Sequence, residues 1–164
     1  MPIAPVSLQA YRASLLHFHA DPAFSEDAHA FHADGLLIVA DGKVVAAGDY
    51  AQLLPTLPAG TEVIDYRGKL IVPGFIDTHL HFPQTEMIAS PAPGLLPWLE
   101  QYTFPTERAF EDPVHARDVA EFFLDELLRC GTTTAMVYGS VHPQSVDAFF
   151  GASEARGLRM VAGK

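Results

Sequence analysis

From Phe75 onward the sequence alternates between strand-like and helix-like segments, and this alternation limits the possible folds more than any other feature. The elements that we expect are, in order, a strand at 75–81, a helix at 113–129, a buried strand at 132–138, a helix at 143–155 and a strand at 158–162. Asp112 is a favourable N-cap residue, Pro113 suits the first helical position, and Gly131 suits the position after the helix end. A β-α-β-α-β order predicts a parallel sheet with helical crossovers.

A proline-rich stretch separates the first of these strands from the first helix. It contains prolines at 83, 91, 93 and 97, and proline lacks the backbone N–H that helices and strands use. We therefore expect a long loop at 82–97, followed by a short helix at 98–104.

Ahead of Pro73 the pattern changes to short apolar runs that are separated by turn residues. Runs at 36–39 and 43–46 flank Asp41-Gly42, a pair that accepts the positive φ of a type I′ turn and predicts a hairpin. The remaining segments are expected as a strand within 6–18, a loop at 19–34 and two short strands at 61–66 and 70–72. Several short strands at this spacing predict a small sandwich-like domain.

Together these patterns predict an α/β chain in two parts. Residues 1–72 are expected to form part of a β-sandwich domain, and residues 73–164 to form the first strands and helices of a (β/α)8 TIM-type barrel. Such a barrel needs roughly 250 residues, and about three of its strands are expected here. We therefore interpret the sequence as the front portion of a longer protein.

Composition narrows the class of protein. The chain has 164 residues, 49% of them hydrophobic, which is enough to bury a core. Its net charge of −10 argues against a nucleic-acid or anionic-membrane binder, because such surfaces need clustered positive charge. The single cysteine excludes a disulfide framework, and no apolar run reaches the roughly 18 residues of a membrane span. With no basic, apolar leader at the N-terminus, we expect a soluble, cytoplasmic protein.

The strongest chemical signal is His79-Leu80-His81, at the end of the first expected barrel strand. Residues two apart in a strand point to the same face, so both imidazoles project together. Neutral imidazole nitrogens bind zinc, and also Fe²⁺, and barrel active sites lie at this end of the strands. The alternative is that the two histidines only form hydrogen bonds to nearby loops. Their position at the strand end favours a metal-ligand pair.

The surrounding sequence adds a family resemblance. Residues 72–81 read Val-Pro-Gly-Phe-Ile-Asp-Thr-His-Leu-His, which resembles the signature that opens the barrel of the amidohydrolase superfamily. The segments at 82–85, 90–91 and 99–107 resemble the guanine deaminase branch of that superfamily, and 131–135 also fits it.

This resemblance implies a mononuclear zinc enzyme, homodimeric when complete, that hydrolyses guanine to xanthine and ammonia. His79 and His81 match the first two metal ligands, while Gln84, together with His81, matches the positions that contact the purine. A glutamine amide offers both donors and an acceptor to a base edge that carries both. The other metal ligands and the proton-transferring glutamate are expected beyond Lys164, which itself is not expected to bind metal. Residues 1–72 match the N-terminal part of the family's β-sandwich domain. The remaining strands of that domain come from the far C-terminal part of the family's sequences.

Two alternatives stay open. Another aminohydrolase or chlorohydrolase of this superfamily, acting on a triazine, a pterin or a different purine, would share the His-x-His signature. The chain could instead be a catalytically inactive fragment that acts only with its complement.

Other residues receive structural interpretations. Trp98, among leucines, is expected to pack in the core rather than to wall a purine pocket. Glu107 and Arg108 are expected to form an exposed ion pair rather than to help orient the active-site loop. Cys130, at a helix end, is expected to be a small apolar filler, and His142 a loop histidine.

Overall fold

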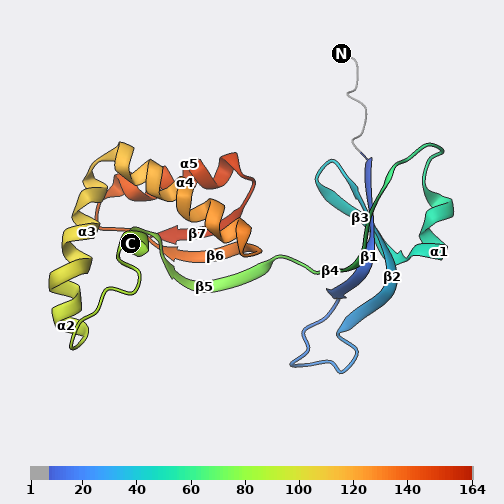
Figure 1. Cartoon of the computed structure of the whole chain (residues 1–164), viewed down its shortest axis with the longest axis horizontal. Coiled ribbons are helices and arrows are strands. Elements are labelled where there is room, and N and C mark those ends of the chain that lie inside the picture. Colours follow the sequence, from blue (N-terminus) through green and yellow to red (C-terminus); the bar gives the residue numbers. More distant parts are fainter. Residues whose placement is uncertain (1–7, 164) are drawn as a thin grey trace, which may run out of the picture. The chain divides into compact units, whose positions relative to one another are not determined.

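The computed structural model describes residues 8–163 and has a mixed α/β fold (Figure 1). The chain divides into two compact units, with the boundary between Pro73 and Gly74. Val6 and Ser7, at the start of the first expected strand, and Lys164 lie outside the described residues.

Unit 1 is a four-stranded sheet with a short helix. Its elements are β1 (Leu8–Phe18), β2 (His29–Ala40), β3 (Lys43–Asp49), α1 (Tyr50–Leu53), a 3₁₀ turn (Leu54–Thr56) and β4 (Val63–Ile71). The strand order is β3-β2-β1-β4, antiparallel except for the parallel pair of β1 and β4. The hairpin prediction is confirmed, since Asp41 and Gly42 have φ of 49° and 74° between β2 and β3.

Two expectations for unit 1 need correction, and the part of a β-sandwich expected at 1–72 stays a prediction. Residues 29–34 belong to β2 rather than to a loop, because they pair with the end of β1, where Phe18 lies opposite His29. The runs at 61–66 and 70–72 form the single strand β4, which keeps its pairing with β1 through an irregular register and a positive φ at Gly68. The described residues of unit 1 form one sheet, without a second sheet facing it.

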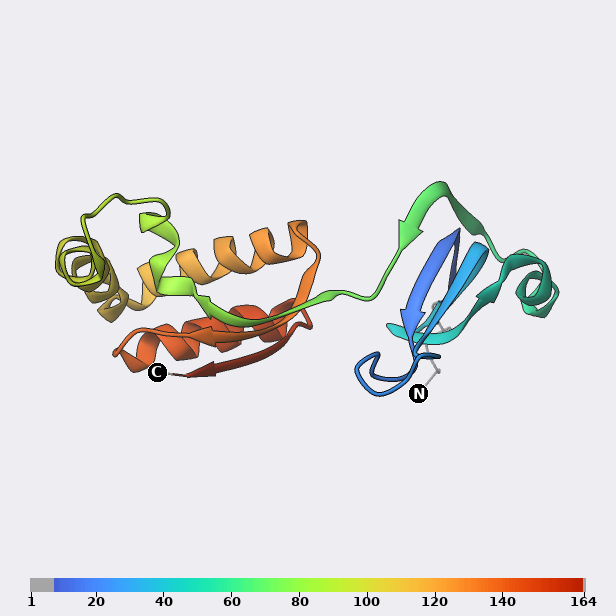
Figure 2. The same cartoon turned by 90° about the horizontal axis from the view of Figure 1, so that it is seen from below.

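Unit 2 has the β-α-β-α-β order that the sequence predicts. Its regular elements are β5 (Phe75–His81), α4 (Pro113–Arg129), β6 (Thr132–Tyr138), α5 (Pro143–Ala155) and β7 (Arg159–Gly163). The three strands are parallel and lie side by side in the order β5-β6-β7 (Figure 2). No helix within residues 8–163 has both the length and the apolar character needed to cross a membrane.

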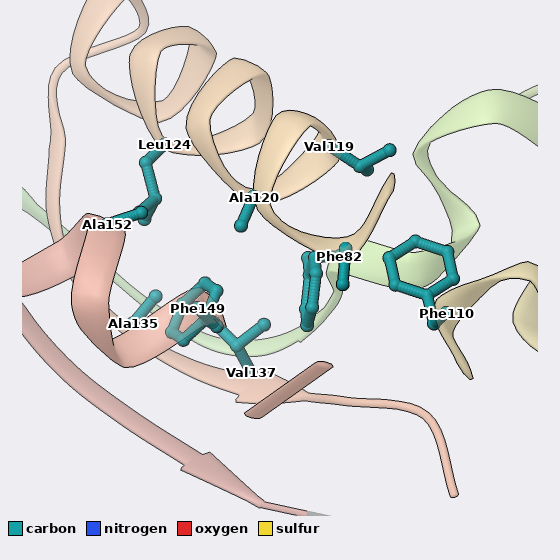
Figure 3. Close-up of a cluster of buried hydrophobic side chains, with 10 residues drawn as sticks. Phe82, Phe110, Val119, Ala120, Leu124, Ala135, Val137, Phe149 and Ala152 are labelled. Atoms are coloured by element: carbon teal, nitrogen blue, oxygen red, sulfur yellow. The ribbon is translucent and has the colours of Figure 1, made fainter. Parts of the chain in front are cut away.

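The core of unit 2 lies between the sheet and the helices α4 and α5 (Figure 3). Phe82, Phe110 and Phe149 are fully buried, and the Phe82 ring centroid lies 5.3 Å from that of Phe110 and 5.1 Å from that of Phe149. Because Phe82 directly follows His81, its burial anchors the end of β5. The chemically important end of this strand is thus attached to a packed core.

The opposite face of this sheet is open in the described chain. On β6, Ala135 and Val137 are buried against the helices, whereas Met136 and Tyr138 are 49% and 42% exposed. The expectation of a buried strand at 132–138 is therefore correct only for its helix-facing side. The alternation follows from the strand's two-residue period, since helices cover one face alone.

The proline-rich stretch is more helical than expected. It forms a 3₁₀ segment (Phe82–Met87), α2 (Leu95–Trp98), a π-helical turn (Leu99–Thr103), α3 (Phe104–Arg108) and a further 3₁₀ turn (Ala109–Glu111). The loop expected at 82–97 is therefore helical at both of its ends, and the prediction is wrong there. Pro83 and Pro105 occupy first-turn positions, where the missing N–H leaves no helical hydrogen bond unmade.

Gly74 explains how β5 begins close to β6. A Cβ atom built on Gly74 would lie 2.0 Å from Thr133 Oγ1, which no side chain tolerates. Gly131, with φ of 83°, ends the preceding helix as expected, and its carbonyl accepts a hydrogen bond from Phe75 N–H at 2.8 Å.

Asp112 caps α4, as the sequence predicts. Its Oδ1 accepts a hydrogen bond from Val114 N–H at 2.9 Å. We expect Asp112→Ala to lower the free energy of unfolding by about 1 kcal/mol, because an N-terminal helix donor loses its partner. Urea unfolding of the full-length protein measures this change. Glu111→Ala removes a neighbouring exposed carboxylate outside the cap and should change stability much less; equal losses would contradict the capping role.

Candidate metal and substrate site

His79 and His81 lie together at the end of β5. Their Nε2 atoms are 3.3 Å apart, and their ring centroids are 5.2 Å apart. The N–H of His79 donates to Asp77 Oδ1 at 3.0 Å, which ties the strand locally. The two imidazoles therefore project to the same side of the strand.

The spacing of the two imidazole nitrogens fits a shared metal ion. Two nitrogen ligands at about 2.0–2.1 Å from one tetrahedral zinc lie about 3.3–3.4 Å apart, and the Nε2 atoms here are 3.3 Å apart. The same distance allows a weak hydrogen bond between the rings. Within residues 8–163, no three His, Cys, Asp or Glu side chains gather as a possible metal site. His79 and His81 therefore fit as two members of a larger set of metal ligands.

The environment of His81 favours its neutral form. Burial lowers the pKa of His81 below its usual value, the neighbouring His79 lowers it further, and Glu107 acts in the opposite direction. Neutral imidazole is the form that binds a metal ion.

Tyr138, which we did not single out from the sequence, supports both histidines. Its ring centroid lies 4.7 Å from that of His81, nearly parallel to it, and 5.3 Å from that of His79. The register of the parallel strands pairs His81 with Tyr138, each at the end of its strand. Aligning the ends of the two predicted strands would have indicated this contact.

Gln84 lies on the 3₁₀ segment that follows β5 and contacts two charged or polar groups. Its Nε2 donates to Glu107 Oε1 at 3.2 Å and lies 3.4 Å from His81 Nδ1. Glu107 comes from α3 and is half-buried. The expected ion pair between Glu107 and Arg108 is wrong: in the described structure the carboxylate of Glu107 faces Gln84.

The histidine pair and Gln84 line one cavity of about 530 Å³. Trp98 lines the same cavity and is half-buried, so its expected place in the core is wrong. The neighbouring leucines gave a misleading signal, since Leu95 and Leu96 are largely exposed. Cys130 also borders this cavity and is exposed, which corrects its interpretation as an apolar filler.

His142 lies in the loop after β6, as expected, and directly precedes α5. Its backbone N–H donates to Ser140 Oγ at 3.2 Å, and its side chain makes no hydrogen bond within the described residues.

The sequence profile of the amidohydrolase family matches residues 70–164. This match covers all of unit 2, including β5, the helices α4 and α5, and the histidine pair. The chain therefore belongs to the amidohydrolase family.

Within that family, several of the similar proteins are named guanine deaminase, and others are imidazolonepropionases and triazine hydrolases. Guanine deaminase of Escherichia coli K12 is 53% identical over 134 residues, covering 82% of this chain and 30% of that protein. The solved structure of E. coli guanine deaminase superposes with a TM-score of 0.87 at 48% identity, covering 95% of this chain and 37% of that one. Guanine deaminase from C. acetobutylicum, solved with guanine bound in its active site, gives a TM-score of 0.78 at 26% identity, with 96% and 36% covered. This chain thus spans about a third of the length of these proteins.

Proposed function

We propose that this chain is the N-terminal portion of a zinc-dependent guanine deaminase, which converts guanine and water to xanthine and ammonia. The observation that carries the proposal is the convergence of His79, His81 and Gln84 on one cavity. The 53% identity to the E. coli guanine deaminase supports the choice of reaction.

Each of the three residues has a chemical task in this proposal. His79 and His81 would hold the metal through their Nε2 atoms, and the Tyr138 ring, stacked on His81 and tilted against His79, would help to keep the two imidazoles in place. A divalent metal held there would supply Lewis-acid activation of water for attack on the purine carbon that carries the amine. Gln84 would orient the base by hydrogen bonding to its edge. We propose that the proton-transferring carboxylic acid and the other metal ligands come from sequence beyond Lys164.

The architecture follows the same proposal. We infer that unit 2 is the first part of a (β/α)8 barrel, which supports a site at the C-terminal ends of its strands. Unit 1 would belong to a β-sandwich that later strands complete. Both inferences rest on the parallel order β5-β6-β7 and on the open faces of the two sheets.

The test is a guanine-to-xanthine assay on the full-length protein that carries this chain, after metal removal and after zinc addition. We expect xanthine and ammonia in equal amounts, turnover that is lost with the metal, and recovery with zinc. A panel of a triazine, a pterin and adenine distinguishes the other aminohydrolase activities. Turnover of one of these in preference to guanine would overturn the proposal.

Gln84→Ala should weaken guanine turnover in the full-length protein without loss of metal. Polar groups of the base edge would lose their partner, at a cost of about 1–3 kcal/mol, which is roughly fivefold to 150-fold in kcat/KM. Steady-state kinetics and metal analysis measure the two quantities. Gln101→Ala is the matched control, since Gln101 is exposed and does not line the cavity. An unchanged kcat/KM for guanine would remove Gln84 from the substrate site.

A further inference from the structure

We propose that Glu107 is a positioning residue, whose carboxylate fixes the side-chain amide of Gln84 so that its carbonyl oxygen faces the substrate. This inference rests on the proposed function, because it concerns how the same cavity recognises guanine. It begins from the contact between Gln84 Nε2 and Glu107 Oε1 at 3.2 Å.

The chemistry of the two groups determines which way the amide points. An ionised carboxylate only accepts hydrogen bonds, so it can hold only the amino end of the Gln84 amide. A reversed amide would place its carbonyl oxygen against the carboxylate oxygen, with no proton between them. The contact therefore selects one of the two amide orientations.

The carboxylate is itself held in place by the fold. Glu107 lies on α3, between Thr103 and Phe110, which are 2% and 0% exposed. Because both neighbours are anchored in the core, the helical segment carries Glu107 to a fixed position. Glu107 is half-buried, so solvent screens its hydrogen bond less than it would on an open surface.

Metal binding would leave Glu107 as the principal partner of this amide. When His81 binds a metal through Nε2, its ring proton must lie on Nδ1. Nδ1–H is then a donor: it no longer accepts a hydrogen bond from Gln84 Nε2, 3.4 Å away, and by itself it would favour the reversed amide. Within the described residues, the hydrogen bond to Glu107 remains as the one that orients Gln84.

The opposite end of the amide is free to meet a ligand. Gln84 Oε1 makes no hydrogen bond within residues 8–163, and it is not among the buried side-chain atoms that lack a partner. Gln84 lines the cavity that also contains His79 and His81. The site therefore presents a hydrogen-bond acceptor, which matches the ring N–H and amine donors of guanine. A reversed amide would present N–H groups to those donors.

Glu107→Gln in the zinc-loaded, full-length protein tests this role. The new amide can either donate or accept, so Gln84 can adopt both orientations. We expect the KM for guanine to rise about tenfold, which corresponds to about 1.4 kcal/mol, with kcat changed less than about threefold. Bound zinc and the thermal midpoint should stay at wild-type values. Glu111→Gln, an exposed carboxylate on the same helical stretch, is the matched control.

A double-mutant cycle separates positioning from a general structural effect. If Glu107 acts through Gln84, Glu107→Gln should add nothing to the loss already caused by Gln84→Ala. Glu107→Ala serves as a second variant, and its effect should also vanish in the Gln84→Ala background. A wild-type KM in Glu107→Gln, or equal losses in both backgrounds, overturns the inference alone. A zinc-loaded wild-type protein that does not turn over guanine overturns the proposed function and this inference with it.

Discussion

Replacing both His79 and His81 with alanine should remove the bound metal from the full-length protein and abolish guanine turnover. The two Nε2 atoms lie 3.3 Å apart, which suits two ligands of one ion. Loss of only an outer hydrogen-bond partner of a metal ligand costs roughly 10–100-fold in affinity or activity. Loss of two ligands should therefore lower kcat/KM by more than about a thousandfold. Metal analysis and the guanine assay, performed on the same preparation, measure both effects.

The matched control for this pair is His19→Ala with His29→Ala. Both of these histidines are exposed residues of unit 1, so the double variant removes two imidazoles without touching the cavity. It should keep wild-type metal content and turnover. Full metal occupancy in the His79 and His81 double variant would contradict their assignment as ligands, even if activity were lost.

The parts of the fold that depend on local signals could be predicted from the sequence. Asp112 and Pro113 start α4, Gly131 ends it, and Asp41-Gly42 forms the hairpin turn, because each depends on its own backbone and near neighbours. The arrangement of His79 and His81 could also be predicted from a local signal. It follows from the two-residue period of a strand.

Contacts between distant segments could not be predicted in the same way. Glu107 contacts Gln84 across 23 residues, and the intervening prolines conceal a helical stretch whose turns bring Glu107 against Gln84. Trp98 was misinterpreted for a related reason, since neighbouring leucines indicate burial only when the fold supplies a core next to them. In both cases the missing information was how the 82–111 segment packs on unit 2.

The site also shows why a motif alone is incomplete. The His-x-His spacing identifies two metal-binding side chains but does not indicate what holds their rings or what orients a ligand beside them. Tyr138 holds the rings, because it stacks on His81 and makes a tilted contact with His79, through the register of β6 against β5. Gln84 and Glu107 concern the orientation of the ligand, and they come from two different helical segments.

Residues 1–164, produced alone, should have no guanine deaminase activity and should associate in solution. The described residues bring together two imidazoles but no third metal-binding side chain, and two ligands alone hold zinc weakly. We also expect the proton-transferring acid to be absent. Activity should therefore stay at the uncatalysed level, even with added zinc.

Association is expected because of the open face and edges of the unit 2 sheet. Ile76 and Val161 are 70% and 58% exposed, and Phe75 at the start of β5 is 58% exposed. Burying side chains of this kind contributes about 1.5–3 kcal/mol each, so contact with a second copy is favourable. The outer edge of β5 also leaves backbone groups available for pairing with another strand.

Light scattering coupled to size-exclusion chromatography measures the association, and the guanine assay measures the activity of the same sample. Ile76→Lys should reduce the association, because it places a charge on the open face. Glu111→Lys makes a charge change on an exposed 3₁₀ turn outside the sheet and should not reduce it. Supplying the rest of the protein as a second polypeptide should restore a defined species with guanine turnover. A monodisperse 164-residue monomer that deaminates guanine by itself would show that the two imidazoles and Gln84 already form a sufficient site.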